Sequence, residues 1–239
     1  MNTSLQVNIS NKKQYLYVWL DILGFSDILD KQDSYKELIN LLKYFRNKFE
    51  SIELTTKTLT ISDGIVLIFE LNEELYSLNE IFQNIAKIQE EFVLEKNYFL
   101  RGGMAVGTIE ENEQDDGLKY LISNALSKAY NLESKFVKYP IIATSKSEID
   151  KLNEFYFGEK GLEQFGLQKS YSTSSKTGKE EYIYFIDFMS NKRFEDILKA
   201  GLKKHQSSPQ VLEKYIWLYR YYNQKFESSG DSHIGGVAL

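Results

Sequence analysis

The stretch QYLYVWLD (residues 14–21) is a dense run of apolar and aromatic residues that ends on a carboxylate, Asp21. A run of this kind predicts a central, buried β-strand. Apolar residues at helical spacing follow it and predict a helix, at Tyr35, Leu38, Leu41, Leu42, Phe45 and Phe49. The chain therefore opens with a strand and then a helix.

The next segments extend this order. Alternating Thr and apolar residues at 53–61, a polar break at Ser62, Asp63 and Gly64, and the apolar run 65–70 predict a β-hairpin. A helix at 77–94 and a strand at 97–108 follow. The order β-α-β-β-α-β predicts an α+β, ferredoxin-like fold, an antiparallel-rich sheet with helices on one face.

The second half of the chain has weaker patterns. We expect an acidic loop at 110–117, a short strand at 118–122, a helix at 123–138 and a strand at 139–144 that has Pro140 near its start. A short helix, a polar loop around 170–180 and a strand at 182–188 come next. Two C-terminal helices are predicted, at 191–205 and 209–227.

Composition excludes several classes of protein. The 239 residues are 42% apolar and 14% aromatic, enough for one domain with a sizeable core. No cysteine and only two histidines exclude disulfides, a structural zinc site and a thiol nucleophile. The net charge of −5 without a basic stripe disfavours nucleic acid as a partner. No apolar stretch approaches the ~20 residues of a membrane span, so we expect no membrane contact and a cytoplasmic protein.

Two carboxylates are candidates for a metal site. In a ferredoxin-like fold, the end of the first strand and the turn of the hairpin lie side by side, which places Asp21 near Asp63. Two carboxylates there repel each other unless a divalent cation neutralises them, and oxygen ligands favour Mg²⁺ or Mn²⁺. The alternative is that each is an ordinary strand-end or turn residue, which on position alone is the commoner case.

A small-residue segment follows Asp21. Leu23, Gly24, Phe25 and Ser26 join the strand to a helix, and backbone N–H groups at such a junction favour a phosphate. Gly24 alone is weak evidence, because strand-to-helix turns use glycine for backbone reasons as well.

Four segments together resemble class III nucleotidyl cyclases. They are LDILGFSDIL (20–29), TISDGIVLIF (60–69), FLRGGMAVGT (99–108) and SNALSKAYNLES (123–134), in the family's order. The resemblance covers about residues 14–145. Within the superfamily, the chain is most similar to the bacterial pyrimidine cyclases of Pycsar anti-phage defence, which make cyclic UMP or cyclic CMP as a messenger for a separate effector.

The resemblance implies a site and an assembly. Two Mg²⁺ or Mn²⁺ ions would be held by Asp21, Asp63 and the Ile22 carbonyl, with the phosphates on 23–26, in a head-to-tail homodimer. The expected division is a flexible N-terminus (1–13), a cyclase catalytic domain (14–190), a C-terminal helical extension (191–227) and a flexible tail (228–239).

Departures from the family concern the base. Purine cyclases read it with polar residues where this chain has Leu59 and Tyr120, and neither supplies a purine-reading hydrogen-bond pattern. This disfavours ATP and GTP and suits a smaller pyrimidine. Lys57 shares the strand face of Leu59 and could approach the base or the phosphates, or simply be solvated.

Two further departures concern catalysis. Ser127 and Asn131 stand where the family has its ribose-orienting Asn and transition-state Arg. Charge on the phosphate would then be met by the metals or by another cation, namely Arg101, Lys128 or Lys135. Arg101 could equally be a conformational anchor.

The sequence thus predicts a pyrimidine nucleotide cyclase that converts UTP, or CTP, to the 3′,5′-cyclic nucleotide and pyrophosphate. One alternative is a cyclase-like nucleotide-binding module with little or no turnover. Another is an interaction protein that docks a partner on its aromatic C-terminal helix, with Tyr215, Trp217, Tyr219, Tyr221 and Tyr222. Polymerase-type transfer by a two-metal site is a further alternative, disfavoured by the weak basic character.

Overall fold

The computed structural model describes residues 13–25, 35–53, 55–61, 64–71, 75–113, 119–156, 167–173 and 180–227. Ser26 and Asp63 lie outside these ranges, as do residues 1–12 and the expected tail at 228–239.

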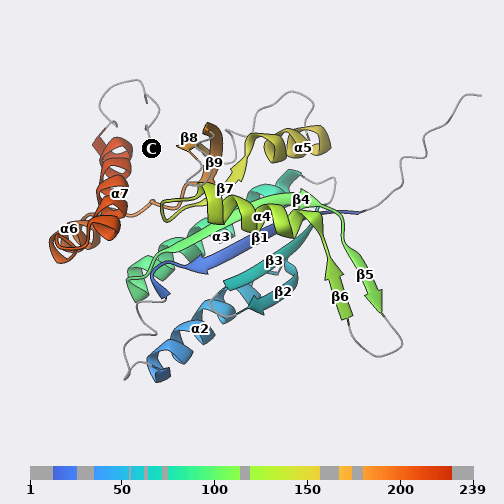
Figure 1. The fold of residues 1–239 in the computed structure, drawn as a ribbon, viewed down its shortest axis with the longest axis horizontal. Coiled ribbons are helices and arrows are strands. Elements are labelled where there is room, and N and C mark those ends of the chain that lie inside the picture. The colour runs from blue at the N-terminus through green and yellow to red at the C-terminus, as the bar shows by residue number, and fades with distance from the viewer. Residues whose placement is uncertain are drawn as a thin grey trace, which may run out of the picture.

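A seven-stranded sheet with strand order β2-β3-β1-β4-β7-β9-β8 forms the centre of the molecule (Figure 1). Its strands are β1 (Gln14–Ile22), β2 (Thr55–Ile61), β3 (Gly64–Leu71), β4 (Leu100–Gly107), β7 (Ile142–Ser145), β8 (Leu167–Thr173) and β9 (Glu180–Ile186). The helices are α2 (Tyr35–Glu50), α3 (Leu75–Lys96), α4 (Asn124–Phe136), α5 (Lys146–Tyr156), α6 (Phe194–Lys204) and α7 (Pro209–Glu227).

The first half of the chain has the predicted β-α-β-β-α-β order. β1 lies between β3 and β4 and is antiparallel to both, and β2 pairs with the outer side of β3. The antiparallel, ferredoxin-like prediction is therefore confirmed for this part of the sheet. β7 then adds to β4 as a parallel strand, and β9 and β8 continue the sheet with antiparallel pairs.

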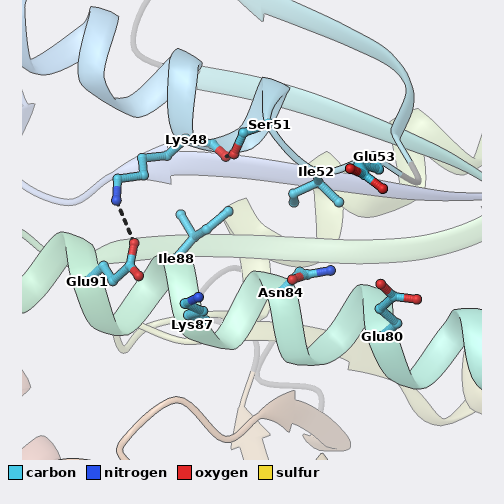
Figure 2. Close-up of a pocket in the computed structure, with 9 residues that line it drawn as sticks. All are labelled: Lys48, Ser51, Ile52, Glu53, Glu80, Asn84, Lys87, Ile88 and Glu91. Atoms are coloured by element: carbon cyan, nitrogen blue, oxygen red, sulfur yellow. Dashed lines mark hydrogen bonds and ion pairs between the residues drawn. The ribbon is translucent and has the colours of Figure 1, made fainter.

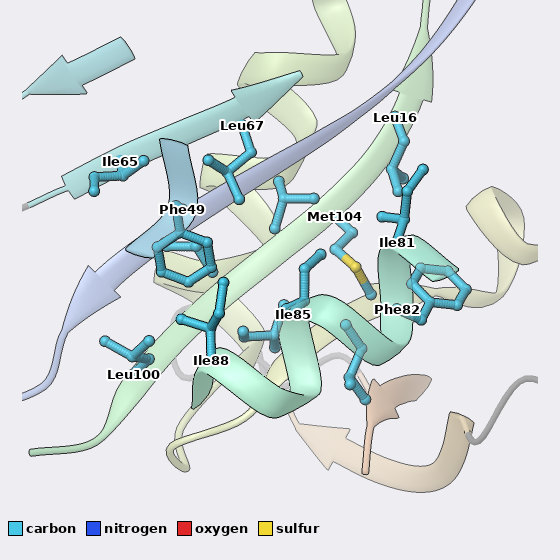
Figure 3. Packing of buried hydrophobic residues seen from close by; sticks show 14 of the residues in the cluster. Leu16, Phe49, Ile65, Leu67, Ile81, Phe82, Ile85, Ile88, Leu100 and Met104 are labelled. Carbon is cyan, nitrogen blue, oxygen red and sulfur yellow. The ribbon is translucent and has the colours of Figure 1, made fainter. Parts of the chain in front are cut away.

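Alternation along β1 separates two apolar layers. Leu16, Val18 and Leu20 are buried in one cluster with residues of α2 and α3, part of which Figure 3 shows. Tyr17 points to the opposite face and is buried with Ala125 and Ala129 of α4. Successive side chains of a strand point to opposite faces, so a strand apolar on both sides is a buried central one.

Two glycines of β4 allow α4 to lie very close to the sheet. A Cβ at Gly103 would lie 2.1 Å from the Ala129 carbonyl oxygen, and one at Gly107 would lie 2.9 Å from Ala125 Cβ. Any side chain at 103 would collide with helix backbone, so the glycine fixes where α4 docks. Helix α4 adds a layer on the face opposite α2 and α3.

The C-terminal helices belong to a second large core. Trp217, Leu218, Tyr221 and Tyr222 of α7 are buried with residues of α6 and of β7 and β9. Burial raises the pKa of the Tyr221 phenol well above its ordinary value. Three of the five aromatic side chains considered for partner docking are therefore core residues, which disfavours that alternative.

Two segments predicted as loops begin with residues that form strands. Glu110–Glu113 forms β5, which pairs with β6 (Lys119–Ile122) in a separate two-stranded hairpin that projects from the sheet in Figure 1. The polar segment from about 170 continues β8 to Thr173, paired with β9. In both cases, backbone pairing with a neighbouring strand outweighs the low strand propensity of the residues.

Among the described residues, the structure contains no helix with the length and apolarity of a membrane span.

Candidate functional site

Asp21 lies near the end of β1, between two neighbours set by strand register. Its Cα partner is Gly64 on β3 and Arg101 on β4. Ile61 pairs with Gly64, so the β2–β3 hairpin turns beside Asp21. The predicted partner, Asp63, falls in that turn but outside the described residues.

Arg101 links Asp21 to helix α4. Its Nη2 lies 3.4 Å from Asp21 Oδ2 and forms a closer ion pair with Glu133 Oε1. The side chains of Asp21 and Arg101 are 23% and 25% exposed, whereas Glu133 is buried. The structure thus brings together two of the predicted residues and a third that the sequence interpretation missed.

Glu133 did have a signal in the sequence. Ala125, Ala129 and Glu133 recur every four residues in the helix predicted at 123–138, so they share one face. A carboxylate on an otherwise apolar helix face requires a buried cation, and Arg101 supplies it.

Part of the segment after Asp21 forms a backbone hydrogen bond within the fold. The Leu23 N–H donates to the Phe99 carbonyl at 2.9 Å, which uses this amide within the fold. Gly24 has φ 82° and is exposed, so glycine is needed at this turn, and Phe25 is buried. The predicted phosphate contact therefore falls on the N–H groups after Leu23.

Ser127 and Asn131 form a pair on the side of α4 that faces away from the sheet. Asn131 Nδ2 donates to the Ser127 carbonyl at 2.7 Å and lies 3.3 Å from Ser127 Oγ. Ser127 is exposed, whereas Ala125 and Ala129 face the sheet. Within one chain this pair does not converge with Asp21.

Lys57 and Leu59 lie on the same sheet face as Asp21. Leu59 pairs with Val66, which pairs with Trp19, and Lys57 pairs with Ile68. Leu59 and Trp19 each pack against the edge of the α4 cluster, with Val66 of β3 between them in the register. This face therefore carries apolar side chains on β1 and β2 beside the α4 cluster.

An aromatic pair lies on the same face of the sheet, at β1 and α4. Trp19 contacts Tyr130 of α4 edge to face, with ring centroids 5.2 Å apart, and Tyr130 is 50% exposed. The apolar face is therefore only partly covered by its own chain.

The other predicted residues lie elsewhere. Tyr120 belongs to β6, in the projecting hairpin. Lys128 Nζ lies 3.6 Å from Glu148 Oε1, towards α5. Lys135 is in the last turn of α4.

The residues fit a hard cation. Asp21 offers a partly exposed carboxylate that Arg101 Nη2 contacts at 3.4 Å, and the adjacent Ile22 carbonyl is also a hard oxygen donor. No three His, Cys, Asp or Glu residues gather as a metal site in the part of the chain that the structure describes, which omits Asp63.

A groove of about 380 Å³ lies elsewhere, between α2 and α3 (Figure 2). It is lined by charges of both signs, and Lys48 Nζ forms an ion pair with Glu91 at 2.6 Å across it. None of the predicted site residues lines it, so it is not the candidate site.

Comparisons with known proteins identify the fold. No family model and no curated protein sequence matches the chain. Among solved structures, the adenylyl cyclase CyaB from P. aeruginosa is similar with a TM-score of 0.54 and 14% identity, over 76% of this chain and 96% of that one. The guanylate cyclase domain of RhGC from Catenaria anguillulae, in complex with GTP, has a TM-score of 0.53 and 15% identity, over 73% and 96%.

A third similar structure is the guanylyl cyclase domain of the RhoGC fusion protein from Blastocladiella emersonii, described as a non-canonical dimer. Its TM-score is 0.52 at 16% identity, over 73% of this chain and 96% of that one. The match thus covers 96% of each of these three neighbours. The chain has the fold of class III nucleotidyl cyclase catalytic domains.

Proposed function

We propose that this protein is a nucleotidyl cyclase that converts a pyrimidine nucleoside triphosphate, UTP or CTP, to the 3′,5′-cyclic nucleotide and pyrophosphate. The observation that carries the proposal is the position of Asp21 within the cyclase fold. The register pairs Asp21, whose side chain is 23% exposed, with Gly64, the residue that follows Asp63 in the sequence. The cyclase domains with this fold support the same reaction class.

In this proposal, different residues of the chain bind the metal ions and the phosphates. Asp21, Asp63 and the Ile22 carbonyl would hold two Mg²⁺ or Mn²⁺ ions, and the N–H groups after Leu23 would bind the β- and γ-phosphates. The ions, when bound, would lower the pKa of the ribose 3′-hydroxyl and neutralise the leaving pyrophosphate. The 3′-oxygen then attacks the α-phosphorus in line, so one P–O bond forms as the bond to pyrophosphate breaks.

Base preference is inferred from the apolar face near the site. Leu59 packs against the apolar α4 cluster, and its side chain offers no hydrogen bond to a base edge. A site without polar readers leaves the polar edge of a bound purine unpaired, which costs binding energy. A pyrimidine has a smaller polar edge, so the cost is lower.

A head-to-tail homodimer would complete the site. Ser127 and Asn131 are directed away from Asp21 of their own chain, and Trp19 and Tyr130 leave apolar surface half-exposed. A second copy that covers this face would bring its α4 to the Asp21 edge. The cyclic nucleotide would then act on a separate effector in anti-phage defence.

The deciding experiment is an incubation of the purified protein with each of the four common triphosphates and Mn²⁺, with products identified by mass. We expect cyclic UMP or cyclic CMP and pyrophosphate. Cyclic AMP or cyclic GMP as the main product would refute the pyrimidine assignment.

A nucleotide-binding module without turnover is the second candidate. It is favoured by one observation: Asn131 donates its amide to the Ser127 carbonyl, so neither side chain replaces the missing arginine in this state. Binding of a triphosphate with Mn²⁺, without release of pyrophosphate from any of the four, would select this reading.

A further inference from the structure

The turn that follows β1 is attached to Phe99, the residue before β4. The Leu23 N–H donates to the Phe99 carbonyl at 2.9 Å, and Gly24 follows directly with φ 82°. The Leu23 side chain is partly buried and packs against the second large core, the cluster that contains Phe99 and much of α7. The turn is therefore anchored to Phe99 by its backbone and to the second core by its first side chain.

The Phe99 ring is held in turn by the C-terminal helices. It is 5% exposed and meets Tyr215 of α7 edge to face, with ring centroids 5.6 Å apart. Tyr215 is itself seated on α6, because its ring stacks on His205 with centroids 5.3 Å apart. A Cβ at Gly201 would lie 2.0 Å from Tyr215 Cε1, so a bare backbone there lets the ring lie against α6. The ring that Phe99 contacts is thus fixed by two helices.

We propose that Tyr215 is a positioning residue, which acts through Phe99 to hold the turn after Leu23 in the conformation that binds the β- and γ-phosphates. The inference rests on the proposed function, since it needs this turn to be the phosphate site. Phe99 precedes the ladder between β1 and β4, which ends at the pair Ile22 and Leu100, so the packing of its ring helps to direct its carbonyl. The C-terminal helices are then part of the catalytic unit and not an appended extension.

The first test is hydrogen–deuterium exchange of the full chain, read at the Leu23 amide. Tyr215→Leu keeps an apolar side chain but removes the ring that Phe99 contacts. We expect it to speed exchange of this amide about fivefold, the worth of one aromatic contact. Tyr215→Phe keeps the ring and should exchange at the wild-type rate.

The matched control is Tyr222→Leu. Tyr222 is also on α7, is also 5% exposed, and contacts the Phe226 ring of the same helix with centroids 4.6 Å apart. Its substitution should lower the free energy of unfolding in urea and leave exchange at Leu23 unchanged. If Tyr215 only stabilised the fold, the two Leu variants would speed exchange in proportion to their losses of stability.

The second test is equilibrium dialysis with Mn²⁺ and 3′-deoxy-UTP, which cannot cyclise, and with Mn²⁺ and inorganic tripolyphosphate, which has no base. We expect Tyr215→Leu to raise the Kd of both probes about fivefold, because the change acts at the phosphates and is limited by the contact removed. Tyr215→Phe and Tyr222→Leu should keep the wild-type values.

The combined results separate the inference from the proposed function. Unchanged exchange at Leu23 in Tyr215→Leu, or an equal change in Tyr222→Leu, overturns the inference and leaves the proposed function standing. Faster exchange with unchanged Kd values shows that the turn does not hold the phosphates, which overturns the inference and that part of the proposed function. Wild-type protein that binds neither probe overturns both.

A second variant covers the case in which Tyr215→Leu does not fold. Phe99→Leu then takes its place, since it removes the other ring of the same contact. The same changes in exchange and in Kd are expected, and wild-type values for both would overturn the inference.

Discussion

Each end of β4 lies beside a buried glutamate, and the two differ in what else they reach. Glu148, near Val106, accepts the Val106 N–H at 2.8 Å and the Lys151 ammonium at 2.6 and 2.8 Å. Glu133 forms an ion pair with the Arg101 guanidinium, which also contacts Asp21. The Glu148 network involves only a backbone amide and a lysine among the contacts named here, so we interpret it as structural. The second includes Asp21, a predicted site residue whose side chain is 23% exposed.

Substitution of Asp21, at the Arg101 end of β4, has the largest expected effect. Asp21→Ala should lower turnover about a thousandfold or more, because lost metal binding removes several kcal/mol of transition-state stabilisation. Arg101 keeps Glu133 as partner, so the fold should survive. Product formation by mass and circular dichroism check the two parts. Wild-type turnover in Asp21→Ala or in Asp63→Ala would remove the metal assignment.

The docking of α4 between the two ends is tested by its glycines. Gly103→Ala should lower the free energy of unfolding by about 3 kcal/mol, because its Cβ would meet helix backbone. Gly107→Ala should cost about 1 kcal/mol, since it meets only the Ala125 methyl group. Urea denaturation of both variants measures the difference. Equal costs would mean that α4 docks differently.

Substitution of Glu148, at the Val106 end of β4, should affect stability alone. Glu148→Gln keeps an acceptor for the Val106 amide but loses the charge that binds Lys151, so the free energy of unfolding should fall by about 2 kcal/mol. Turnover per folded molecule should stay at the wild-type value. A loss of turnover without a loss of stability would show that both ends of β4 serve the reaction.

The smallest expected effect is that of substituting Leu59, on the apolar sheet face that β2 shares with β1. Leu59→Lys should shift the ratio of kcat/KM for UTP over ATP by about fivefold towards ATP, the worth of about one net hydrogen bond. Competition assays with both nucleotides measure it. Leu59→Met is the control, because it changes shape without adding a donor. A ratio that stays constant in Leu59→Lys would place the base elsewhere.

Strong periodicity explains which elements were predictable. β1, the β2–β3 hairpin and α7 match their predicted ranges closely, since apolar alternation, a polar turn and Pro209 mark them. β5 and β8 were missed because polar, Glu-rich or Ser-rich segments become strands only when a neighbour pairs with their backbone.

The site was predictable in part. The motifs named Asp21 and Arg101 as candidate residues, but that the two are neighbours comes from the strand register. The roles of the site residues remain predictions. Glu133 required the contact between α4 and β4, which depends on a bare backbone at Gly103 and is a tertiary property. The base-reading groups depend on how a second copy would cover Trp19 and Leu59, which one chain's sequence does not specify.

The shared core of α7 bears on how the chain folds during its synthesis. The cluster beneath α2 and α3 draws most of its residues from before Gly107, so this half can pack while the ribosome is still translating. Val93 and Phe99 emerge early as well, but they pack with Trp217 and Tyr221, which come more than a hundred residues later. The apolar residues of this second cluster that are synthesised early therefore stay exposed to water until α7 leaves the exit tunnel.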